Sequence, residues 1–267
     1  MQIYLSLMSL FPRGLRFFIE SAETAGFNGI EVFNFQFSKK KIRNSADLAK
    51  KIGLNVHFHQ AWPYEDDPTW INWLLNKLGF LPPLGLDAKI QFEGIDEPVV
   101  VCPDEWRDAV GRKNFWTQTN LSHGPKGMKM SLSDFIDIVK RYKLSVVFDT
   151  QHYLEDCFRK NGVEFISSDK EILLDLLAKS WEQLGPYTKE IHLCDFNPKL
   201  GNQKGRNLFL GEGIFPLEGF ADMVKKSGWN GTIIPEVKSQ HILRLRRIDT
   251  LKSLVKLRRT VEDIFKI

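Results

Sequence analysis

Short runs of apolar, β-favouring residues alternate with longer amphipathic stretches along the whole chain, and this alternation constrains the fold more than any other feature. The short runs predict eight strands, at Gln2–Met8, Gly29–Phe33, Leu54–His59, Pro98–Cys102, Phe115–Thr119, Leu144–Asp149, Glu190–Asp195 and Gly231–Val237. The longer stretches predict helices near Gly14–Ala25, Ser45–Ile52, Pro68–Leu78, Pro103–Val110, Ser131–Arg141, Lys170–Leu184, Pro216–Lys226 and Ile248–Ile264. Strands that alternate with helices indicate an α/β protein with a parallel sheet.

The number of strand–helix units favours a closed sheet over an open one. Eight units in 267 residues average about 33 residues each, the usual length of one such unit. The predicted strands are nearly continuous in apolar residues, as expected for parallel strands covered on both faces. Because closure leaves no exposed edge strand, we expect a closed (β/α)₈ TIM barrel. No linker or low-complexity tract divides the chain, so residues 1–267 are expected to form a single domain.

Composition narrows the range of partners and compartments. The net charge of +4 is mild beside 33 acidic residues, so it permits an anionic small molecule and does not call for nucleic acid. The three cysteines are odd in number and widely spaced, as expected of reduced thiols in a cytoplasmic protein. No apolar run approaches the roughly 18 residues that a membrane span needs. We therefore expect a soluble cytoplasmic protein with no membrane partner.

Polar residues interrupt several predicted strands near their carboxyl ends. They are Glu31, His57 with His59, Thr119 with Asn120, Asp149, His192 with Asp195, and Glu236. A parallel barrel gathers these strand ends on one face, where barrel active sites lie. An internal ion pair explains any one of them taken singly, but carboxylates and imidazoles that meet at one rim indicate a divalent-metal site. Oxygen ligands suit Mn²⁺, Mg²⁺ or Co²⁺, and additional histidine favours Zn²⁺.

Five short motifs follow one another along the chain. They are GFNGIE at 26–31, VFDTQH at 147–152, IHLCD at 191–195, LGEG at 210–213 with Phe215-Pro216 after it, and GWNGTIIPE at 228–236. In this order and spacing they resemble the xylose-isomerase-like TIM barrels. That superfamily contains sugar isomerases and epimerases as well as endonuclease IV. No single motif is specific, but their order and spacing together are.

The resemblance implies a metal site with one departure from the family. It makes Asp149, His192 and Glu236 metal ligands, and it makes His152 either a substrate contact, as in the epimerases, or an additional ligand, as in the nuclease. The family's fourth ligand is a Glu at the end of strand five, normally followed by Asn. Thr119 holds that position here, before Asn120. The metal site therefore loses a carboxylate, and the epimerase pattern loses one of its two opposed bases.

The expected function is a metal-dependent isomerase or epimerase that acts on a sugar, a sugar phosphate or a related polyol. Glu236 would remove a proton next to a carbonyl, and the metal would stabilise the resulting enediolate. Because Thr119 stands opposite Glu236, the sequence favours isomerisation by one base over epimerisation by two bases. The expected substrate-binding residues are His57, His59 and Asn120 at strand ends, and Lys126, Lys204 and Arg206 on rim loops. The three cations could hold a phosphate, although solvated loop charge is their commoner role.

Two other functions stay open from the sequence. One is a barrel that has lost or rewired its metal site, which the threonine at position 119 favours, since fold does not guarantee function. The other is an endonuclease-IV-like phosphodiesterase, which is disfavoured. It needs an Asp-x-His pair just before Leu210, where the chain reads GRNLF at 205–209, and a strand-four histidine, where it reads Val101-Cys102-Pro103. The mild net charge also does not indicate a basic surface large enough to bind a DNA duplex.

Overall fold

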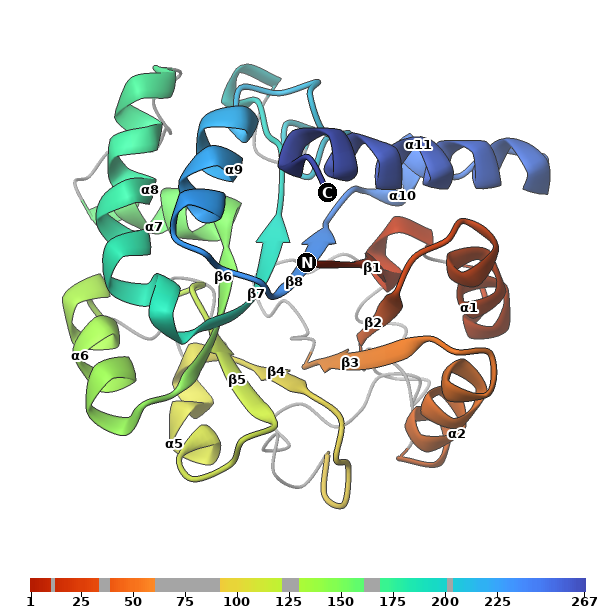
Figure 1. Ribbon diagram of the computed structural model, residues 1–267, viewed down its shortest axis with the longest axis horizontal. Helices are drawn as coiled ribbons and strands as arrows, with labels where there is room; N and C mark the ends of the chain where they lie inside the picture. The colour runs from red at the N-terminus through yellow and green to blue at the C-terminus, as the bar shows by residue number, and fades with distance from the viewer. Residues whose placement is uncertain (11–12, 34–38, 61–91, 122–129, 161–168, 201–203) are drawn as a thin grey trace, which may run out of the picture.

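The computed structural model of the protein describes residues 1–10, 13–33, 39–60, 92–121, 130–160, 169–200 and 204–267. Eight strands form one closed parallel barrel in the order β1-β2-β3-β4-β5-β6-β7-β8 (Figure 1). They are β1 Gln2–Ser6, β2 Gly29–Phe33, β3 Asn55–His59, β4 Val99–Val101, β5 Phe115–Gln118, β6 Ser145–Asp149, β7 Thr188–Leu193 and β8 Thr232–Pro235. The predicted (β/α)₈ barrel is confirmed.

Helices surround the barrel on its outside (Figure 1). They are α1 Leu15–Thr24, α2 Lys39–Lys51, α5 Trp106–Ala109, α6 Leu132–Tyr142, α7 Thr150–Lys160, α8 Lys170–Leu184, α9 Leu217–Lys226, α10 Ser239–Ile242 and α11 Arg247–Phe265. Short 3₁₀ helices lie at Leu7–Leu10, Pro103–Glu105, Gly185–Tyr187 and Pro198–Leu200. The helix expected at Pro68–Leu78 lies outside the described residues. No described helix has both the length and the apolar content that a membrane crossing requires.

The largest differences from the prediction concern helices α2 and α7. Helix α2 begins at Lys39 rather than near Ser45, because a lysine-rich first turn hides its apolar periodicity. Helix α7 was not predicted, and it begins at the residue that follows β6. Asp149 explains this abrupt start, since its Oδ1 accepts the backbone N–H of His152 at 2.9 Å and so caps the new helix. The cap orients the Asp149 side chain at the carboxyl end of the barrel.

Alternate residues of each strand pack on opposite faces of the sheet. Phe148 of β6 faces outward and contacts Trp181 of α8 and Phe220 of α9, at ring-centroid distances of 5.6 and 6.0 Å. The interior face instead mixes ionisable side chains with aromatic ones, since Phe33 stacks on His59 and Trp116 contacts His57. His59 of β3 lies 5.5 Å from His192 of β7 across the barrel, although these strands are not neighbours. The apolar core therefore lies between sheet and helices, and the barrel lumen holds ionisable groups.

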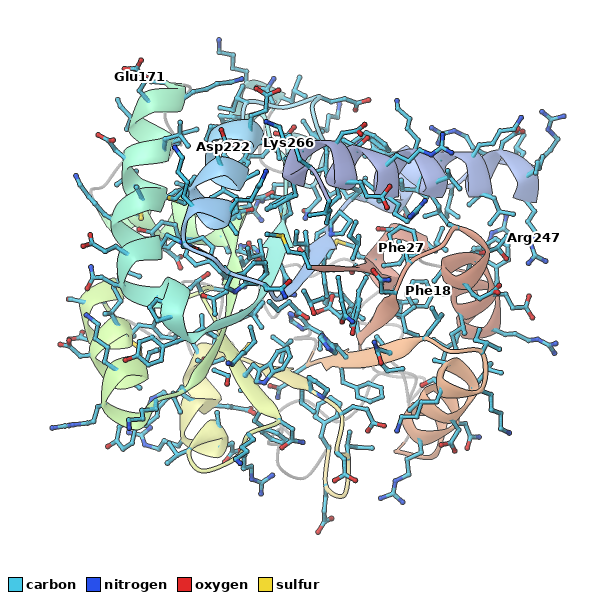
Figure 2. The ribbon with its side chains drawn as sticks, in the orientation of Figure 1. Phe18, Phe27, Glu171, Asp222, Arg247 and Lys266 are labelled. Atoms are coloured by element: carbon cyan, nitrogen blue, oxygen red, sulfur yellow. The ribbon has the colours of Figure 1, made fainter. Side chains whose placement is uncertain are left out.

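Side chains follow the same division in Figure 2. Phe18 and Phe27 are buried in the outer core, with exposed fractions of 0% and 4%. Charged side chains such as Glu171 of α8 and Arg247 of α11 extend from the outer helices. A polar group costs several kcal/mol to bury without a partner. The burial of polar groups in the lumen therefore needs a physical explanation, whereas the solvated charges on the exterior do not.

Candidate metal centre

Strand alternation brings the polar residues of β7 and its extension to one face of the sheet. Glu190, His192 and Cys194 are two residues apart, so all three point into the lumen. In the parallel register, His192 pairs with Asp149 of β6 on one side and Ile234 of β8 on the other. Glu236 follows β8 directly. The three residues expected to bind metal are therefore brought together at the carboxyl end of the barrel.

His192 lies at the centre of this group and is completely buried. Its Nδ1 atom is 3.4 Å from Glu236 Oε1 and 3.9 Å from Asp149 Oδ2. Within the described residues, Nδ1 has no hydrogen-bond partner. A buried ring nitrogen without a partner is unusual, because unpaired buried polar atoms are costly. An atom in this position beside two carboxylates fits a bound cation.

We call Asp149, Cys194 and Glu236 the rim cluster. Each is buried and offers one potential ligand atom, and these atoms lie within 4.8 Å of one another. The Cys194 thiol donates a hydrogen bond to Glu236 Oε2 at 3.4 Å. In the part of the chain that the structure describes, neither carboxylate forms an ion pair with a lysine or arginine. With His192 Nδ1, the rim cluster offers nitrogen, oxygen and sulfur donors, which suit a transition-metal cation.

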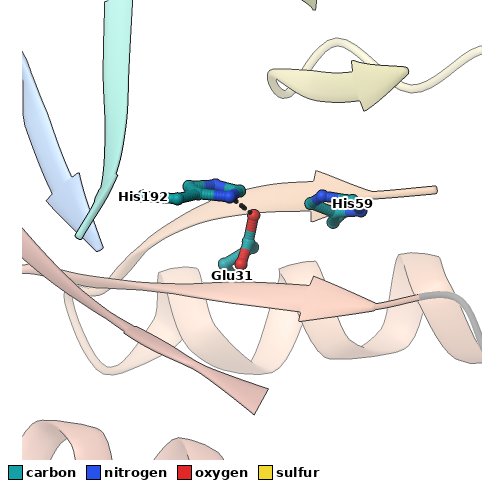
Figure 3. Close-up of side chains that lie close together, drawn as sticks. All are labelled: Glu31, His59 and His192. Atoms are coloured by element: carbon teal, nitrogen blue, oxygen red, sulfur yellow. Dashed lines mark ion pairs between the residues drawn. The ribbon is translucent and has the colours of Figure 1, made fainter. Parts of the chain in front are cut away.

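We call Glu31, His57 and Glu190 the lumen cluster, which lies one layer deeper in the barrel. The other ring nitrogen of His192, Nε2, lies 2.9 Å from Glu190 Oε1 and 3.0 Å from Glu31 Oε1. Figure 3 shows the Glu31 carboxylate pointing to the His192 ring, with His59 nearby. Glu190 also pairs with His57 Nδ1. The lumen cluster thus holds one edge of His192 and leaves its Nδ1 edge toward the rim cluster.

The pKa of Glu190 is lowered in the lumen cluster, whereas the pKa of Glu236 is raised in the rim cluster. Burial disfavours the charged form of Glu190, but His57 and His192 outweigh it and lower its pKa to about 2. Burial is also the largest influence on Glu236, and the Asp149 and Glu31 charges add to it, so its pKa rises to about 7 despite His192. Burial alone would lower the pKa of His192, yet Glu31 and Glu236 hold it well above its usual value. The charge of Glu190 is therefore compensated by two imidazoles, whereas negative charge is in excess around Glu236. Both oxygens of Glu31 lack a hydrogen-bond partner among the described residues.

Thr119 occupies the position where the sequence resemblance implies a carboxylate in the family. Its hydroxyl donates to the Asp149 carbonyl oxygen at 3.2 Å and accepts the Asp149 backbone N–H at 2.9 Å. Both bonds fix the backbone of Asp149 at the end of β6. Thr119 therefore supports the proposed ligand through its main chain, and strand five contributes no carboxylate to the rim.

His152 lies in the first turn of α7, beside the rim cluster. Its Nε2 is 4.0 Å from Asp149 Oδ2, and its Nδ1 is 3.4 Å from Glu155 Oε2. Burial would lower the pKa of His152, but Asp149 and Glu155 raise it to about 9. Glu155 also pairs with Arg206, and burial is outweighed by His152 and Arg206, so the pKa of Glu155 falls to about 2. A cationic edge of His152 and Arg206 thus borders the candidate centre.

The other expected substrate-binding residues lie in different surroundings. His57 and His59 are buried, and both ring nitrogens of His59 are hydrogen-bonded, to the Gln60 carbonyl oxygen at 2.8 Å and to Gln118 Oε1 at 3.1 Å. These contacts favour a structural role for the two histidines. Asn120 is half-buried, and its Oδ1 has no hydrogen-bond partner among the described residues. Lys204 is exposed, and Lys126 lies outside the described residues.

Asp195, the last residue of the IHLCD motif, fixes the conformation of the loop that contains the LGEG turn. Its carboxylate accepts the backbone N–H groups of Phe196, Gly211, Gly213 and Phe215 at 2.8–3.1 Å. Burial raises the pKa of Asp195, although these four amides oppose the rise. A Cβ at Gly213 would lie 2.1 Å from Asp195 Oδ1, so only glycine fits there. The aspartate therefore fixes the LGEG turn beside the rim.

Two residues of the centre were not expected from the sequence. Glu190 falls within a predicted strand without a role in the site, and Cys194 is one of the three cysteines expected only to be reduced thiols. The signal that identifies them is the two-residue period through Glu190, His192 and Cys194, which predicts one shared face once His192 is placed inside the barrel. Which face that is depends on closure of the barrel, and sequence alone does not specify it.

Comparison with known proteins gives one family and several structural relatives. A profile of the xylose isomerase-like TIM barrel family matches residues 120–259, more than half of the 267 residues. The curated proteins contained no match. A D-psicose 3-epimerase from Clostridium cellulolyticum H10, solved with D-tagatose, is 14% identical over 99% of both chains, with a TM-score of 0.56.

Two further solved structures have the same fold. A xylose isomerase domain protein from Alicyclobacillus acidocaldarius is 14% identical, with 100% of this chain and 99% of that chain covered and a TM-score of 0.58. The IolI protein, solved with a zinc atom, is 14% identical over 100% of both chains, with a TM-score of 0.54. At this level of identity the similarity establishes a shared fold.

Proposed function

Because the chain belongs to the xylose isomerase-like TIM barrel family, we propose that it is a divalent-metal-dependent isomerase acting on a sugar, a sugar phosphate or a related polyol. Asp149, His192 and Glu236 are the proposed ligands, and Glu236 is the proposed general base. The observation that carries the proposal is His192 Nδ1, which is buried without a hydrogen-bond partner and faces two carboxylates. The epimerase relative solved with D-tagatose supports the substrate class.

Glu236 has the properties that proton transfer from a carbon acid requires. A bound divalent cation supplies Lewis-acid polarisation of a substrate carbonyl. Removal of the adjacent proton needs a base whose pKa lies near the working pH. Burial and the neighbouring carboxylates bring the pKa of Glu236 to about 7 in the cation-free protein. A bound cation would lower this pKa, so the position of Glu236 beside the proposed cation, rather than the value itself, favours it as the base.

His152 and Arg206 are the proposed substrate contacts on the α7 side of the centre. With its pKa raised to about 9, His152 is protonated at neutral pH, so that both ring nitrogens carry a hydrogen that a substrate oxygen could accept. His152 belongs to the cationic border through its ion pair with Glu155, and this contact favours a role at the substrate over a role as an additional ligand. Arg206 and Asn120 extend the polar border, and Lys126 and Lys204 are proposed to help only with a phosphorylated substrate.

The proposed reaction uses one base. In an epimerisation with two bases, a second acid must deliver a proton from the face opposite Glu236. Thr119 stands where the family carries that second carboxylate, and both of its hydrogen bonds go to the Asp149 backbone. Isomerisation, in which one carboxylate moves a proton between adjacent carbons, therefore fits the residues better than epimerisation.

A second candidate is a barrel whose metal chemistry has been lost. The observation that favours it is again Thr119, together with the short distances between His192 and the carboxylates around it. In this alternative the rim cluster is an internal ion-pair network, and the protein binds its ligand without proton transfer. The two candidates differ in whether the purified protein takes up a stoichiometric cation.

Two measurements on one preparation test the proposal. Protein stripped with a chelator is dialysed against Mn²⁺, Co²⁺, Zn²⁺ or Mg²⁺, and metal content is determined by mass spectrometry. The same samples are incubated in D₂O with D-fructose, D-psicose or D-tagatose, free and phosphorylated, while proton NMR follows exchange beside the carbonyl. We expect one cation per chain and exchange that requires it.

Two variants make the outcome specific. The Asp149→Ala/Glu236→Ala double variant should lose the cation, and Glu236→Gln should lose the exchange. Glu182→Gln, an exposed position on α8, is the matched control and should retain both. Protein that takes up no cation would overturn the proposal in favour of the second candidate. Exchange that survives Glu236→Gln would remove Glu236 as the base.

A further inference from the structure

The surroundings of Cys194 are more polar than those of a typical core cysteine. Buried cysteines usually behave as small hydrophobic residues, yet the Cys194 thiol points into the polar lumen. Its Sγ is 3.4 Å from Glu236 Oε2, and the Asn207 Nδ2 group donates a hydrogen bond to it at 3.6 Å. Asn207 has a φ of 49°, a left-handed conformation that asparagine tolerates better than most residues. The chain thus presents both an acid and an amide donor to one buried sulfur.

The position of Cys194 complements the change at Thr119. With threonine at the end of β5, Asp149, His192 and Glu236 leave the proposed site one protein donor short of four. Cys194 follows β7, two residues after His192, and its Sγ lies within 4.8 Å of ligand atoms of both Asp149 and Glu236. Cys194 therefore lies where it could supply the donor that Thr119 does not.

An independent observation points to a ligand at the same place. His192 Nδ1 is fully buried, has no hydrogen-bond partner among the described residues, and faces the two carboxylates that Cys194 also borders. The thiol and the ring nitrogen come from the same strand face and approach these carboxylates together.

We propose that Cys194 is a metal ligand, so that the site holds one cation by Asp149 and Glu236 oxygens, His192 nitrogen and Cys194 sulfur. The inference rests on the proposed function, since it needs a cation in the rim cluster. The thiol binds as a thiolate: the S–H bond breaks as the S–metal bond forms, and the proton passes to solvent. The Asn207 amide stabilises the thiolate by its hydrogen bond.

The donor set specifies which cations the site prefers. Thiolate and imidazole favour Zn²⁺ and Co²⁺, whereas Mg²⁺ and Mn²⁺ favour sites made of oxygen. Four protein ligands of mixed type are also typical of zinc sites. The protein should therefore select Zn²⁺ or Co²⁺ over Mg²⁺ and Mn²⁺, and the preference should depend on the sulfur.

Cobalt absorption spectroscopy tests the assignment without any enzymatic assay. The stripped protein is titrated with CoCl₂, and absorption is recorded from the near ultraviolet, where thiolate-to-cobalt charge transfer absorbs, to the visible d–d region. We expect a charge-transfer band that saturates at one equivalent of Co²⁺ and disappears in Cys194→Ser. Competition with Zn²⁺ and Mg²⁺ should show at least a 100-fold preference for Zn²⁺, which Cys194→Ser reduces at least tenfold.

Matched variants separate this inference from the function on which it rests. Cys157→Ser removes a half-buried thiol on α7, and it should keep the band. Cobalt that binds through Asp149, His192 and Glu236 without a charge-transfer band would overturn the sulfur ligand and leave the proposed function standing. Absence of bound Co²⁺ and Zn²⁺ would overturn the sulfur ligand, and it would overturn the proposed function as well if Mn²⁺ and Mg²⁺ also failed to bind. Circular dichroism of Cys194→Ser verifies that the barrel is folded.

Discussion

The two edges of the His192 ring meet opposite electrostatic surroundings. On the Nε2 edge, the lumen cluster alternates acid and imidazole, and the pKa of Glu190 falls to about 2. On the Nδ1 edge, the rim cluster gathers two carboxylates and a thiol with no cationic side chain of its own, and the pKa of Glu236 rises to about 7. The comparison indicates that imidazoles compensate the charge of Glu190 in the lumen, whereas the charge around Glu236 at the rim is not compensated in this way, and a cation can bind there.

The largest effect should come from removing the acid of the lumen cluster. Glu190→Ala leaves His57 and His192 without their shared carboxylate in the barrel interior. Loss of one member of a buried charge pair costs about 3–5 kcal/mol, and we expect a decrease of that size in the free energy of unfolding, measured with urea. The exposed Glu182→Ala should stay within about 0.5 kcal/mol of the original protein. A loss below about 1 kcal/mol for Glu190→Ala would show that the lumen cluster is not a compensated ion-pair network.

Removing the acid of the rim cluster should have the opposite effect on the stability of the cation-free protein. A carboxyl whose pKa is raised on folding destabilises the folded state at pH values above that pKa, because the unfolded chain loses its proton more easily. In chelator at pH 8, we therefore expect Glu236→Gln to stabilise the protein by about 1–3 kcal/mol. With saturating Zn²⁺, the same substitution should lower stability, since binding stabilises only the protein that holds the cation. Destabilisation in both conditions would contradict the difference between the clusters.

At the border of the site, the contribution of Glu155 to stability should depend on pH in the acid range. The pKa of Glu155 is lowered to about 2 by His152 and Arg206 against the effect of burial. Its stabilisation is therefore present above the unfolded pKa near 4.5 and is lost as the pH falls toward 2. Glu155→Gln should cost about 1–2 kcal/mol at pH 7 and progressively less below pH 4.5, as followed by urea unfolding at each pH. A cost that is independent of pH would mean that packing, rather than charge, accounts for it.

The smallest effect concerns the support of one proposed ligand. Thr119→Val removes both hydrogen bonds to the Asp149 backbone, and about 1 kcal/mol of stability should be lost with them. Zinc affinity should fall several-fold, because Asp149 is then less well oriented. Thr119→Ser retains the hydroxyl and should retain both properties. Equal zinc affinity in the valine and serine variants would restrict Thr119 to a structural role.

Much of this arrangement follows from sequence periodicity. The alternation of strands and helices predicted the closed barrel, and the strand-end positions of Asp149, His192 and Glu236 predicted that they meet, because parallel strands share one carboxyl end. Helix α7 was missed because Asp149 serves both as a strand end and as a helix cap. A residue with two structural roles gives no separate signal for the second one.

The partners of the polar residues could not be predicted in the same way. His57 and Glu190 are 133 positions apart, and their pairing depends on how the closed barrel brings β3 and β7 across one lumen. The contact of Cys194 with Glu236 depends on the register between β7 and β8, which pairs Leu193 with Pro235. Sequence identifies which residues carry charge, whereas closure and register decide which of those charges neutralise one another.

The central claim is that a cation binds on the Nδ1 side of His192 and not on the Nε2 side. Crystals of the zinc-loaded protein, measured at the zinc absorption edge, test it through an anomalous difference map. We predict one peak at about 2.0–2.3 Å from His192 Nδ1, Asp149, Glu236 and Cys194. A peak between Glu31, His59 and His192, the other buried group with suitable donors, or the absence of any peak in the barrel, would contradict the account.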